Sequence, residues 1–187
     1  MGDRRVLISA TTPGVSVPST LYYYQPFGPT FLVAHSPNGD WARVVTSRYD
    51  IEWFSSEGRR LRAIRQSATG PLLSDAERAR REKTIDEFLA TARVAASSIP
   101  GLPSRKTPVS RIAFDPEGNL WVERSVREGA MREADVFDRE GRLLTQVRWP
   151  RDVDLLGRQL VATSGSYALG VARDSVGTQH VMRLRWR

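Results

Sequence analysis

The sequence predicts a mainly β protein of three four-stranded antiparallel units, with one amphipathic helix inserted between the first two. Three observations lead to this prediction: a five-residue turn that recurs between short alternating strands, units of about forty residues each, and one stretch with helical periodicity. The chain of 187 residues is long enough to bury a hydrophobic core. It contains no Cys, which excludes disulfides, thiolate catalysis and Cys-based metal sites.

Residues 1–28 form a leader with one or two strands, near 5–9 and near 21–24. The leader begins with basic residues, but only the short apolar run 6–8 follows, which is far less than a signal peptide needs. We therefore expect no signal peptide in this chain. The location is open: we expect a cytoplasmic protein from the sequence as written, and a periplasmic or secreted one if a signal is encoded upstream.

A recurring turn begins with Ser or Asp and has Gly at its fourth position. In such a turn, the first side chain accepts a hydrogen bond from the backbone two residues on, and Gly adopts the positive φ that closes a short hairpin loop. Apolar or β-branched residues flank each copy, as strands require. Each copy therefore predicts a β-hairpin. The four copies lie at 36–40, 55–59, 115–119 and 138–142.

The hairpins group in pairs, and each pair makes one four-stranded unit. Residues 29–67 contain the first two turns, and residues 108–150 contain the next two. Residues 151–187 form a third, less regular unit around Gly157 and Gly177. These lengths lie near the roughly 40 to 45 residues of a propeller blade, so the pattern indicates stacked propeller-like blades.

Alternation within the strands predicts which faces are buried. Apolar residues at 49, 51 and 53 share one face of a strand in the first unit. In the last unit, the face of 180–186 that carries His180 is expected to be buried, with His180 as a hydrogen-bonded core residue. Small residues at 168, 170 and 172 make the other face of their strand flat, which allows close approach of a neighbouring sheet.

An insertion over 68–107 separates the first two units and contains the one predicted helix, over about 74–97. Ser74 and Glu77 form a capping box at its start. Apolar residues follow at helical spacing on one face, and charged residues fill the other, which we interpret as solvated. We expect the apolar stripe to lie across an end of the sheets. Its members are Ile85, Phe88, Leu89, Ala92 and Ala96.

The net charge of +7 and the pI near 10.5 raise the question of nucleic-acid binding. The basic excess is spread along the chain, with no basic tail or face. Arg supplies all but two of the 28 basic residues, Lys83 and Lys106, which indicates a coding bias toward Arg. We therefore do not expect a nucleic-acid partner. The sequence also contains no apolar stretch long enough for a membrane span.

Two runs in the second unit, 112–122 and 136–143, together with 167–174 in the third, resemble the bacterial six-bladed β-propellers of the NHL-repeat and TolB-like group. The resemblance covers about residues 29–187. It implies a propeller fold, but it does not imply a reaction, because such propellers include enzymes, ligand binders and scaffolds.

A closed propeller needs at least four blades, and this sequence supplies three. We expect either that the chain is the carboxyl-terminal half of a longer propeller, or that two copies complete a six-bladed ring, or that the sheets splay open. In the first two cases, an exposed blade face or edge would be a surface for self-association or for a protein partner.

Catalytic patterns are sparse. The chain has neither a phosphate-cradling glycine loop nor a nucleophile elbow. Some propellers of the resembling group are calcium-dependent lactonases, with ligands on the innermost strands. Those strands would be 31–36, 109–114 and either 153–156 or 159–163, and they contribute only Asp154 in one of the two registers. We therefore expect no metal and no cofactor.

The remaining functional feature is a surface. In a propeller, Arg48, the loop 124–132, the loop 174–179 and the inserted helix would share one face. We expect a non-catalytic binding or scaffolding module, with Arg side chains holding a protein or a small anionic ligand. The alternative is part of a six-bladed hydrolase or lactonase whose other site residues are absent from this chain. The candidate binding residues are Arg48, Arg124, Arg127 and Arg132.

Overall fold

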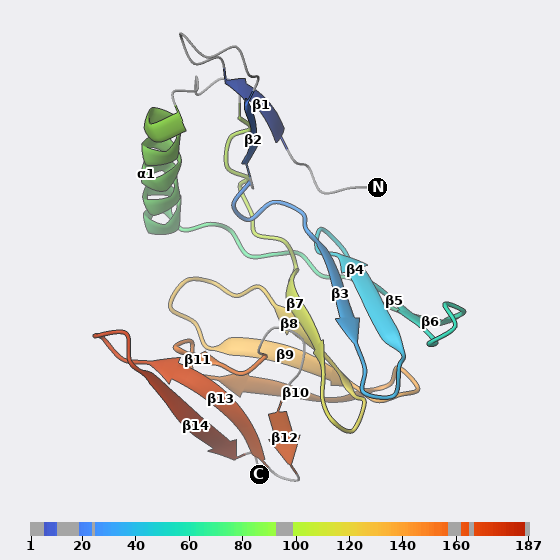
Figure 1. Cartoon of the computed structure of the whole chain (residues 1–187). Coiled ribbons are helices and arrows are strands. Elements are labelled where there is room, and N and C mark those ends of the chain that lie inside the picture. The colour runs from blue at the N-terminus through green and yellow to red at the C-terminus, as the bar shows by residue number, and fades with distance from the viewer. Residues whose placement is uncertain are drawn as a thin grey trace.

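Figure 1 shows the chain in a computed structural model. Its described residues fold into antiparallel β-sheets and one α-helix, so the mainly β class is confirmed. None of these sheets closes on itself within the described part of the chain. The structure describes residues 6–10, 19–23, 25–92, 99–156, 162–164 and 167–185.

The first and second sheets are four-stranded antiparallel meanders, as predicted. In each sheet, the strands pair in the order in which they occur along the chain. The first sheet comprises β3 (Phe31–His35), β4 (Trp41–Val45), β5 (Tyr49–Phe54) and β6 (Arg60–Gln66), and the second comprises β7 (Val109–Phe114), β8 (Leu120–Arg124), β9 (Arg132–Phe137) and β10 (Leu143–Trp149).

The third sheet differs from the predicted four-stranded meander. Its central strand pairs with β14 on one side and, on the other, with β11 and then β12 in succession. The two positions predicted as alternatives for the first strand of this unit therefore both contribute a short strand, β11 and β12. These two strands pair with the same side of β13, one after the other, so the sheet is three strands wide. The reason is that β11 is only two residues long, because the chain leaves the strand to bury Leu155 and Leu156. The strands are β11 (Val153–Asp154), β12 (Ala162–Ser164), β13 (Tyr167–Arg173) and β14 (Gln179–Arg185).

The recurring turns have the predicted geometry. Their Gly residues have φ between +79° and +90°, and in each turn the Gly amide donates to the carbonyl of the opening residue. A fifth turn of this kind opens at Asp174, whose carboxylate accepts from the backbone amides of Val176 and Thr178. Among the four predicted turns, only Asp138 accepts from the amide two residues on, whereas Ser55 and Asp115 accept from the amide four residues on. The buried hydroxyl of Ser36 has no partner among the described residues. Gly157 lies outside the described residues.

The leader contains the two predicted strands, β1 (Val6–Ala10) and β2 (Ser19–Tyr23), which pair as an antiparallel hairpin. The helix α1 (Asp75–Ala92) begins one residue after its cap. The Ser74 hydroxyl accepts from the Glu77 amide at 3.1 Å, and the Ser74 amide donates to the Glu77 carboxylate at 3.3 Å, so the capping box is confirmed.

The helix stands at one end of the stacked sheets (Figure 1). On its predicted apolar stripe, Leu89 is buried, whereas Ile85 and Phe88 are half-buried. The predicted extension to residue 97, with Ala96, lies outside the described residues. Within the part of the chain that the structure describes, no helix combines the length and apolar character needed to cross a bilayer.

Two hydrophobic clusters hold the three sheets together. One joins the first sheet to the second and includes Trp53, whose ring meets the edge of Phe114 at 5.0 Å between centroids. The other joins the second sheet to the third and includes Trp149, Leu155 and Leu156. The second sheet is therefore buried on both faces. The first strands of the first two sheets, β3 and β7, also contact each other.

The prediction that one face of β14, the outer strand of the third sheet, is buried was largely wrong. His180 and Met182 are exposed, and of their predicted face only Leu184 packs against the core among the described residues. The reason is that β14 forms the outer edge of its sheet, so the imidazole of His180 lies 3.1 Å from the Asp174 carboxylate at the surface. The small-residue face of β13 packs toward the second sheet, because Ala168 is fully buried in the cluster that joins the two sheets and Ala172 packs against that cluster. Within its own sheet, a Cβ at Gly170 would lie 2.5 Å from a methyl carbon of Val153 on β11.

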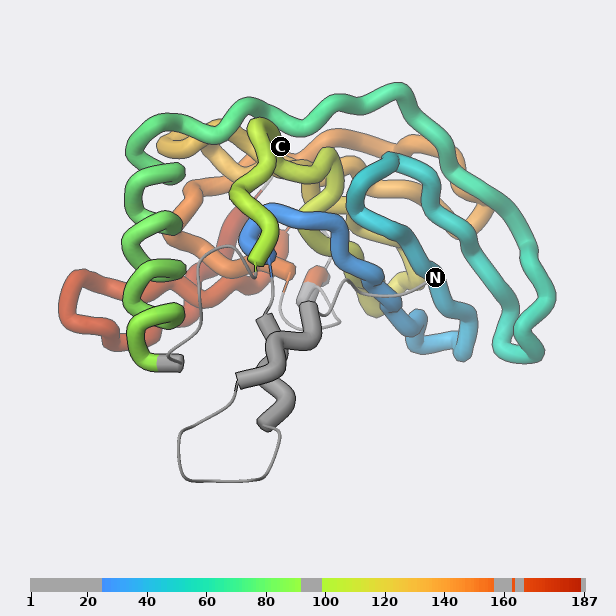
Figure 2. The backbone as a smooth tube through the Cα atoms, turned by 90° about the horizontal axis from the view of Figure 1, so that it is seen from above, coloured from blue at the N-terminus to red at the C-terminus, as the bar shows by residue number. Residues whose placement is uncertain are grey.

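Two segments, 70–73 and 104–106, pair closely in antiparallel direction before the helix, and Figure 2 shows the connection from β6 running along the edge of the molecule to reach α1. The Lys106 amide donates to the Pro71 carbonyl at 2.9 Å, and Gly70 abuts the backbone of Lys106 so closely that a Cβ there would overlap it. Gly70→Ala should therefore lower the free energy of unfolding by about 1 to 3 kcal/mol in urea denaturation. Gly101→Ala, which meets open space, is the matched control and should be neutral; equal effects would contradict the close backbone contact at Gly70.

Candidate anion-binding site

The loop between β8 and β9, residues 125–131, contacts the first half of α1. The Ser74 hydroxyl donates to Glu128 Oε2 at 2.5 Å, and the Arg80 guanidinium donates to Glu128 Oε1. From the other side, Lys106 Nζ donates to the Val126 carbonyl at 2.9 Å. The predicted proximity of the helix and this loop is therefore confirmed.

Lys106 is the centre of this junction. Its ammonium lies 2.5 Å from Glu77 Oε1 and 5.6 Å from the ring centre of Phe27, and its side chain is almost entirely covered. The guanidinium of Arg81 lies 5.5 Å from the same ring. Phe27 has φ of 60°, a strained value for a bulky residue, and the two cations over its ring favour that placement.

Glu128 anchors the loop to the helix in its ionised, carboxylate form. The hydrogen bond from the Ser74 hydroxyl, followed by the one from Arg80, lowers the pKa of Glu128 below its ordinary value. Arg151 adds a smaller electrostatic contribution in the same direction. The carboxylate therefore stays ionised at neutral pH, and it serves as a structural anchor for the loop.

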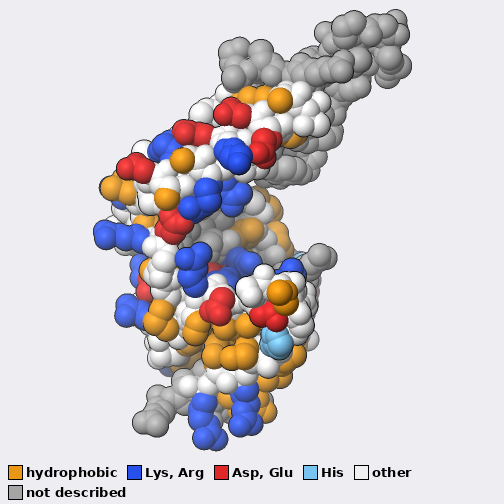
Figure 3. Space-filling view, turned by 90° about the vertical axis from the view of Figure 1, so that its left-hand side faces the viewer, with side chains coloured by type: hydrophobic (Ala, Val, Ile, Leu, Met, Phe, Trp, Pro, Cys, Tyr) orange, Lys and Arg blue, Asp and Glu red, His pale blue; other side chains and the backbone are white. Residues whose placement is uncertain are grey.

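A cleft of about 500 Å³, here called the basic cleft, lies between α1 and the loop. Figure 3 faces this side of the molecule and shows basic side chains gathered around a hollow next to the helix. Six basic side chains and two carboxylates line it, so its lining has a clear positive excess. The charged residues are Arg80, Arg81, Lys106, Arg127, Arg132, Arg151, Glu77 and Glu128.

Three of these cations are available to a ligand. Both carboxylates are already paired, Glu77 with Lys106 and Glu128 with Arg80. By contrast, the guanidinium groups that form no ion pair with any described residue belong to Arg81, Arg127 and Arg151. Guanidinium groups bind carboxylate and phosphate through paired hydrogen bonds, so the arrangement is suited to an anionic group.

A second hollow, of about 780 Å³, opens on the opposite side of the same loop. Arg127 lines both the basic cleft and the second hollow. Leu72 and Met131 line the second hollow as well, with 58% and 51% of their surface exposed. The charged residues of the second hollow are Arg105, Arg124, Arg127, Arg148 and Glu133.

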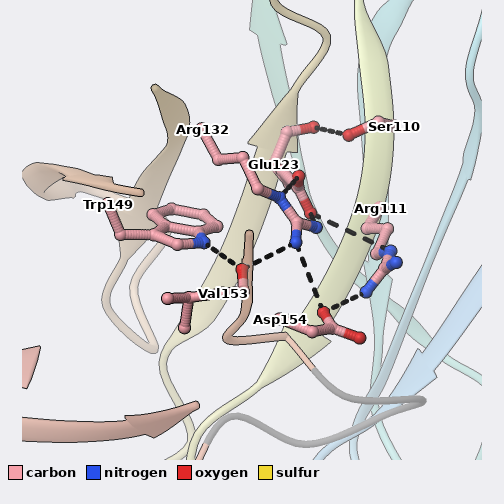
Figure 4. A network of polar contacts seen from close by, with 7 residues as sticks. All are labelled: Ser110, Arg111, Glu123, Arg132, Trp149, Val153 and Asp154. Atoms are coloured by element: carbon pink, nitrogen blue, oxygen red, sulfur yellow. Dashed lines mark hydrogen bonds and ion pairs between the residues drawn. The ribbon is translucent and has the colours of Figure 1, made fainter. Parts of the chain in front are cut away.

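The structure places Arg132, one of the predicted binding residues, in a structural network (Figure 4). Its guanidinium makes two hydrogen bonds to the buried Glu123 carboxylate, at 2.7 and 2.9 Å. It also donates to the Val153 carbonyl at 2.9 Å and lies 5.5 Å from the ring centre of Trp149. Arg132 thus connects the second sheet to the third, and its donors are largely used within the fold.

Arg124 lies at the junction of the first and second sheets. Its guanidinium lies 5.8 Å from the ring centre of Tyr49 and 3.8 Å from Asp135 Oδ2. The Tyr49 hydroxyl donates to the same Asp135 oxygen at 2.6 Å, and Gln146 donates to the other at 2.8 Å. Arg124 therefore balances a buried carboxylate while also lining the second hollow.

Arg48 lies apart from the other three predicted residues. It is exposed and lines a separate hollow of about 320 Å³ on the outer face of the first sheet, beside Asp50 and Glu52. Among the described residues, no hydrogen bond, ion pair or hollow joins Arg48 or the turn 174–179 to the helix.

Sequence reasoning missed the contribution of the helix to the cleft, because its charged run was interpreted as a solvated face. Glu77, Arg80, Arg81 and Thr84 all line the basic cleft. They are spaced at i, i+3, i+4 and i+7, which places them on one helix face. This spacing is the sequence feature from which a shared helix face at the cleft could have been predicted.

Within the described ranges, no group of three or more acidic or His side chains is arranged to hold a metal ion. Asp154 instead accepts a hydrogen bond from Arg111 at 2.6 Å, and the carboxylate of Asp115 closes its own turn. Fold and site together define a mainly β protein of stacked antiparallel sheets with a basic cleft at the helix. Comparisons with family models, curated proteins and solved structures found no match, so the resemblance to six-bladed propellers stays a prediction.

Proposed function

We propose that the protein is a non-catalytic binding module that holds an anionic group of a small ligand or a protein partner in the basic cleft. One observation carries the proposal: Arg81, Arg127 and Arg151 line one cleft and form no ion pair with any described residue. Guanidinium groups that make no direct ion pair keep their donors for a ligand, and a carboxylate or phosphate among three of them would gain charge-assisted hydrogen bonds.

The fixed walls of the cleft support the proposal. Glu128 and Lys106 tie the loop to the helix before any ligand arrives, and a turn from Arg127 to Ala130 closes the loop with a 3.2 Å hydrogen bond. Gly129 has φ of 80° in that turn. A ligand would therefore meet donors whose backbone is already in place, which lowers the entropic cost of binding.

The chemistry of the cleft lining supports binding rather than catalysis. Its two carboxylates, Glu77 and Glu128, both form ion pairs within the protein. The hydroxyl of Thr84 donates to the Arg80 carbonyl of its own helix. None of the described lining residues is a free base positioned to activate a nucleophile.

Calorimetric titration with inorganic pyrophosphate, and separately with citrate, tests the proposal. The variant Arg127→Gln/Arg151→Gln should bind either anion at least about tenfold more weakly, a loss of about 1.4 kcal/mol. Wild-type binding should weaken as salt rises, because the contact is electrostatic.

The matched control removes the same charge outside the cleft. Arg59→Gln/Arg65→Gln changes two exposed Arg residues of the first sheet, and its affinity should remain close to that of the wild type. Equal weakening by both double variants would attribute binding to net charge alone. Unchanged binding in the cleft variant would contradict the proposal outright.

A further inference from the structure

The second hollow and the basic cleft lie on opposite sides of one loop and share three of its residues. Val126, Arg127 and Ala130 line both. A ligand that crosses the loop could therefore contact both hollows at once. Because Glu128 and Lys106 hold the loop against the helix, the two hollows keep a fixed relation to each other.

The second hollow combines positive charge with exposed apolar surface. Four Arg residues and one Glu line it, and Glu133 is already paired with Arg148 at 3.3 Å. Leu72 and Met131 are more than half exposed at the same hollow. Large apolar side chains that stay exposed beside a hollow are typical of interaction sites.

We infer that the ligand is an extended acidic peptide segment of a protein partner, which crosses loop 125–131. Its carboxylates lie in the basic cleft, and one large apolar side chain packs between Leu72 and Met131 in the second hollow. This inference rests on the proposed function and specifies its ligand. The positive lining on both sides of the loop is complementary to acidic residues on both sides of that apolar anchor.

Other polyanions fit these observations less well. A flat anionic bilayer cannot enter two concave sites, whereas a peptide can follow them. Single-stranded nucleic acid needs aromatic rings for base stacking. Among the described residues that line the two hollows, the one aromatic ring is Phe27, which Arg81 and Lys106 already cover. A small phosphate would use the cleft but leave the apolar groups unused.

A labelled synthetic peptide tests the inference through fluorescence anisotropy. The probe carries Asp and Glu residues on both sides of a central Leu, and a second probe has Ser in place of that Leu. The variant Leu72→Ser/Met131→Ser should bind the Leu probe about tenfold more weakly, because the apolar contact is lost. It should bind inorganic pyrophosphate as the wild type does, and the Ser probe should show no difference between the two proteins.

Val176→Ser is the matched control, because Val176 is 84% exposed on a turn that lines neither hollow. Its peptide affinity should be unchanged. The substituted residues are exposed, so thermal unfolding should confirm intact folds.

Each alternative outcome has a distinct meaning. If Leu72→Ser/Met131→Ser binds the Leu probe normally while Arg127→Gln/Arg151→Gln does not, the peptide inference is wrong and the anion-binding proposal stands. If neither variant loses affinity, both are wrong. If vesicles containing phosphatidylserine sediment the protein and displace the probe, a membrane surface is the ligand and the peptide inference is overturned.

Discussion

Replacing Arg132 with Met should lower the free energy of unfolding by about 3 to 5 kcal/mol. Arg132 pairs through two hydrogen bonds with Glu123, which is 5% exposed, and Met keeps most of the aliphatic length without the charge. The substitution would leave the buried Glu123 carboxylate with only the more distant Arg111 guanidinium, at 4.0 Å, and it would remove one of the two hydrogen bonds that the Val153 carbonyl accepts. Urea denaturation followed by tryptophan fluorescence measures the loss.

Two further variants test whether the loss of stability comes from the Arg132–Glu123 ion pair or from general disruption of the fold. Glu123→Gln combined with Arg132→Met should recover a large part of the loss, because the buried charge is then absent. Arg111→Met removes a neighbouring guanidinium from a half-exposed pair with Asp154, and it should cost less than about 1 kcal/mol. If Arg132→Met costs no more than Arg111→Met, the network is not central to the fold.

Asp135→Ala should have the second largest effect, a loss of about 3 kcal/mol. Asp135 is 1% exposed and accepts hydrogen bonds from Tyr49 and Gln146, with Arg124 nearby. The variant would leave the buried Tyr49 hydroxyl without its acceptor at the contact between the first two sheets. Asp135→Asn, which keeps an acceptor oxygen, should lose less. Equal losses would mean that the negative charge of Asp135, rather than its acceptor oxygen, matters here.

Tyr49 should make stability fall at high pH. Burial, followed by the hydrogen bond to the Asp135 carboxylate, raises the pKa of the Tyr49 phenol above its ordinary value. Above about pH 10 the unfolded chain releases this proton while the folded chain keeps it, so stability decreases by about 1.4 kcal/mol per pH unit.

Tyr49→Phe provides the comparison. It should be less stable than the wild type by about 1.5 to 3 kcal/mol near neutral pH, because a buried hydrogen bond to a charged group is lost. The difference should shrink above about pH 10, where only the wild type carries the penalty. Urea denaturation across that range measures it, and a difference that does not change with pH would contradict the assignment.

Features encoded by local sequence could be predicted. The turns that open at Asp115 and Asp138 depend on a side chain and a Gly only three residues apart. Both have the expected positive φ at Gly and an opening carboxylate bonded to the turn backbone, but only Asp138 accepts from the amide two residues on. The capping box at Ser74 depends on the same kind of short spacing. The eight strands of the first two sheets follow from these turns and from alternation.

Features that depend on distant contacts could not be predicted. The third sheet departs from a meander because Leu155 and Leu156 enter a core shared with the second sheet, and that core includes Trp149. The contacts of the Phe27 ring with Arg81 and Lys106 also join segments that are distant in the sequence. His180 alternates like a core residue, yet β14 is an outer edge.

The candidate site was predicted in part. Arg127 and Arg132 line the basic cleft, and their role as binding residues stays a prediction; Arg132 and Arg124 also balance buried carboxylates inside the fold. Arg48 lies in another hollow. Sequence spacing showed that these loops carry Arg residues. It could not show which guanidinium groups find a carboxylate in the folded chain.

A titration of the uniformly ¹⁵N-labelled protein with inorganic pyrophosphate, followed by amide NMR shifts, tests the binding proposal most directly. We predict saturable shifts that centre on the cleft-lining residues Arg127 and Gly129 of the loop and Arg80, Arg81 and Thr84 of the helix. Arg127→Gln/Arg151→Gln should remove them. Shifts centred on the hollow around Arg48, or shifts that spread over the surface without saturating, would contradict an anion site between α1 and loop 125–131.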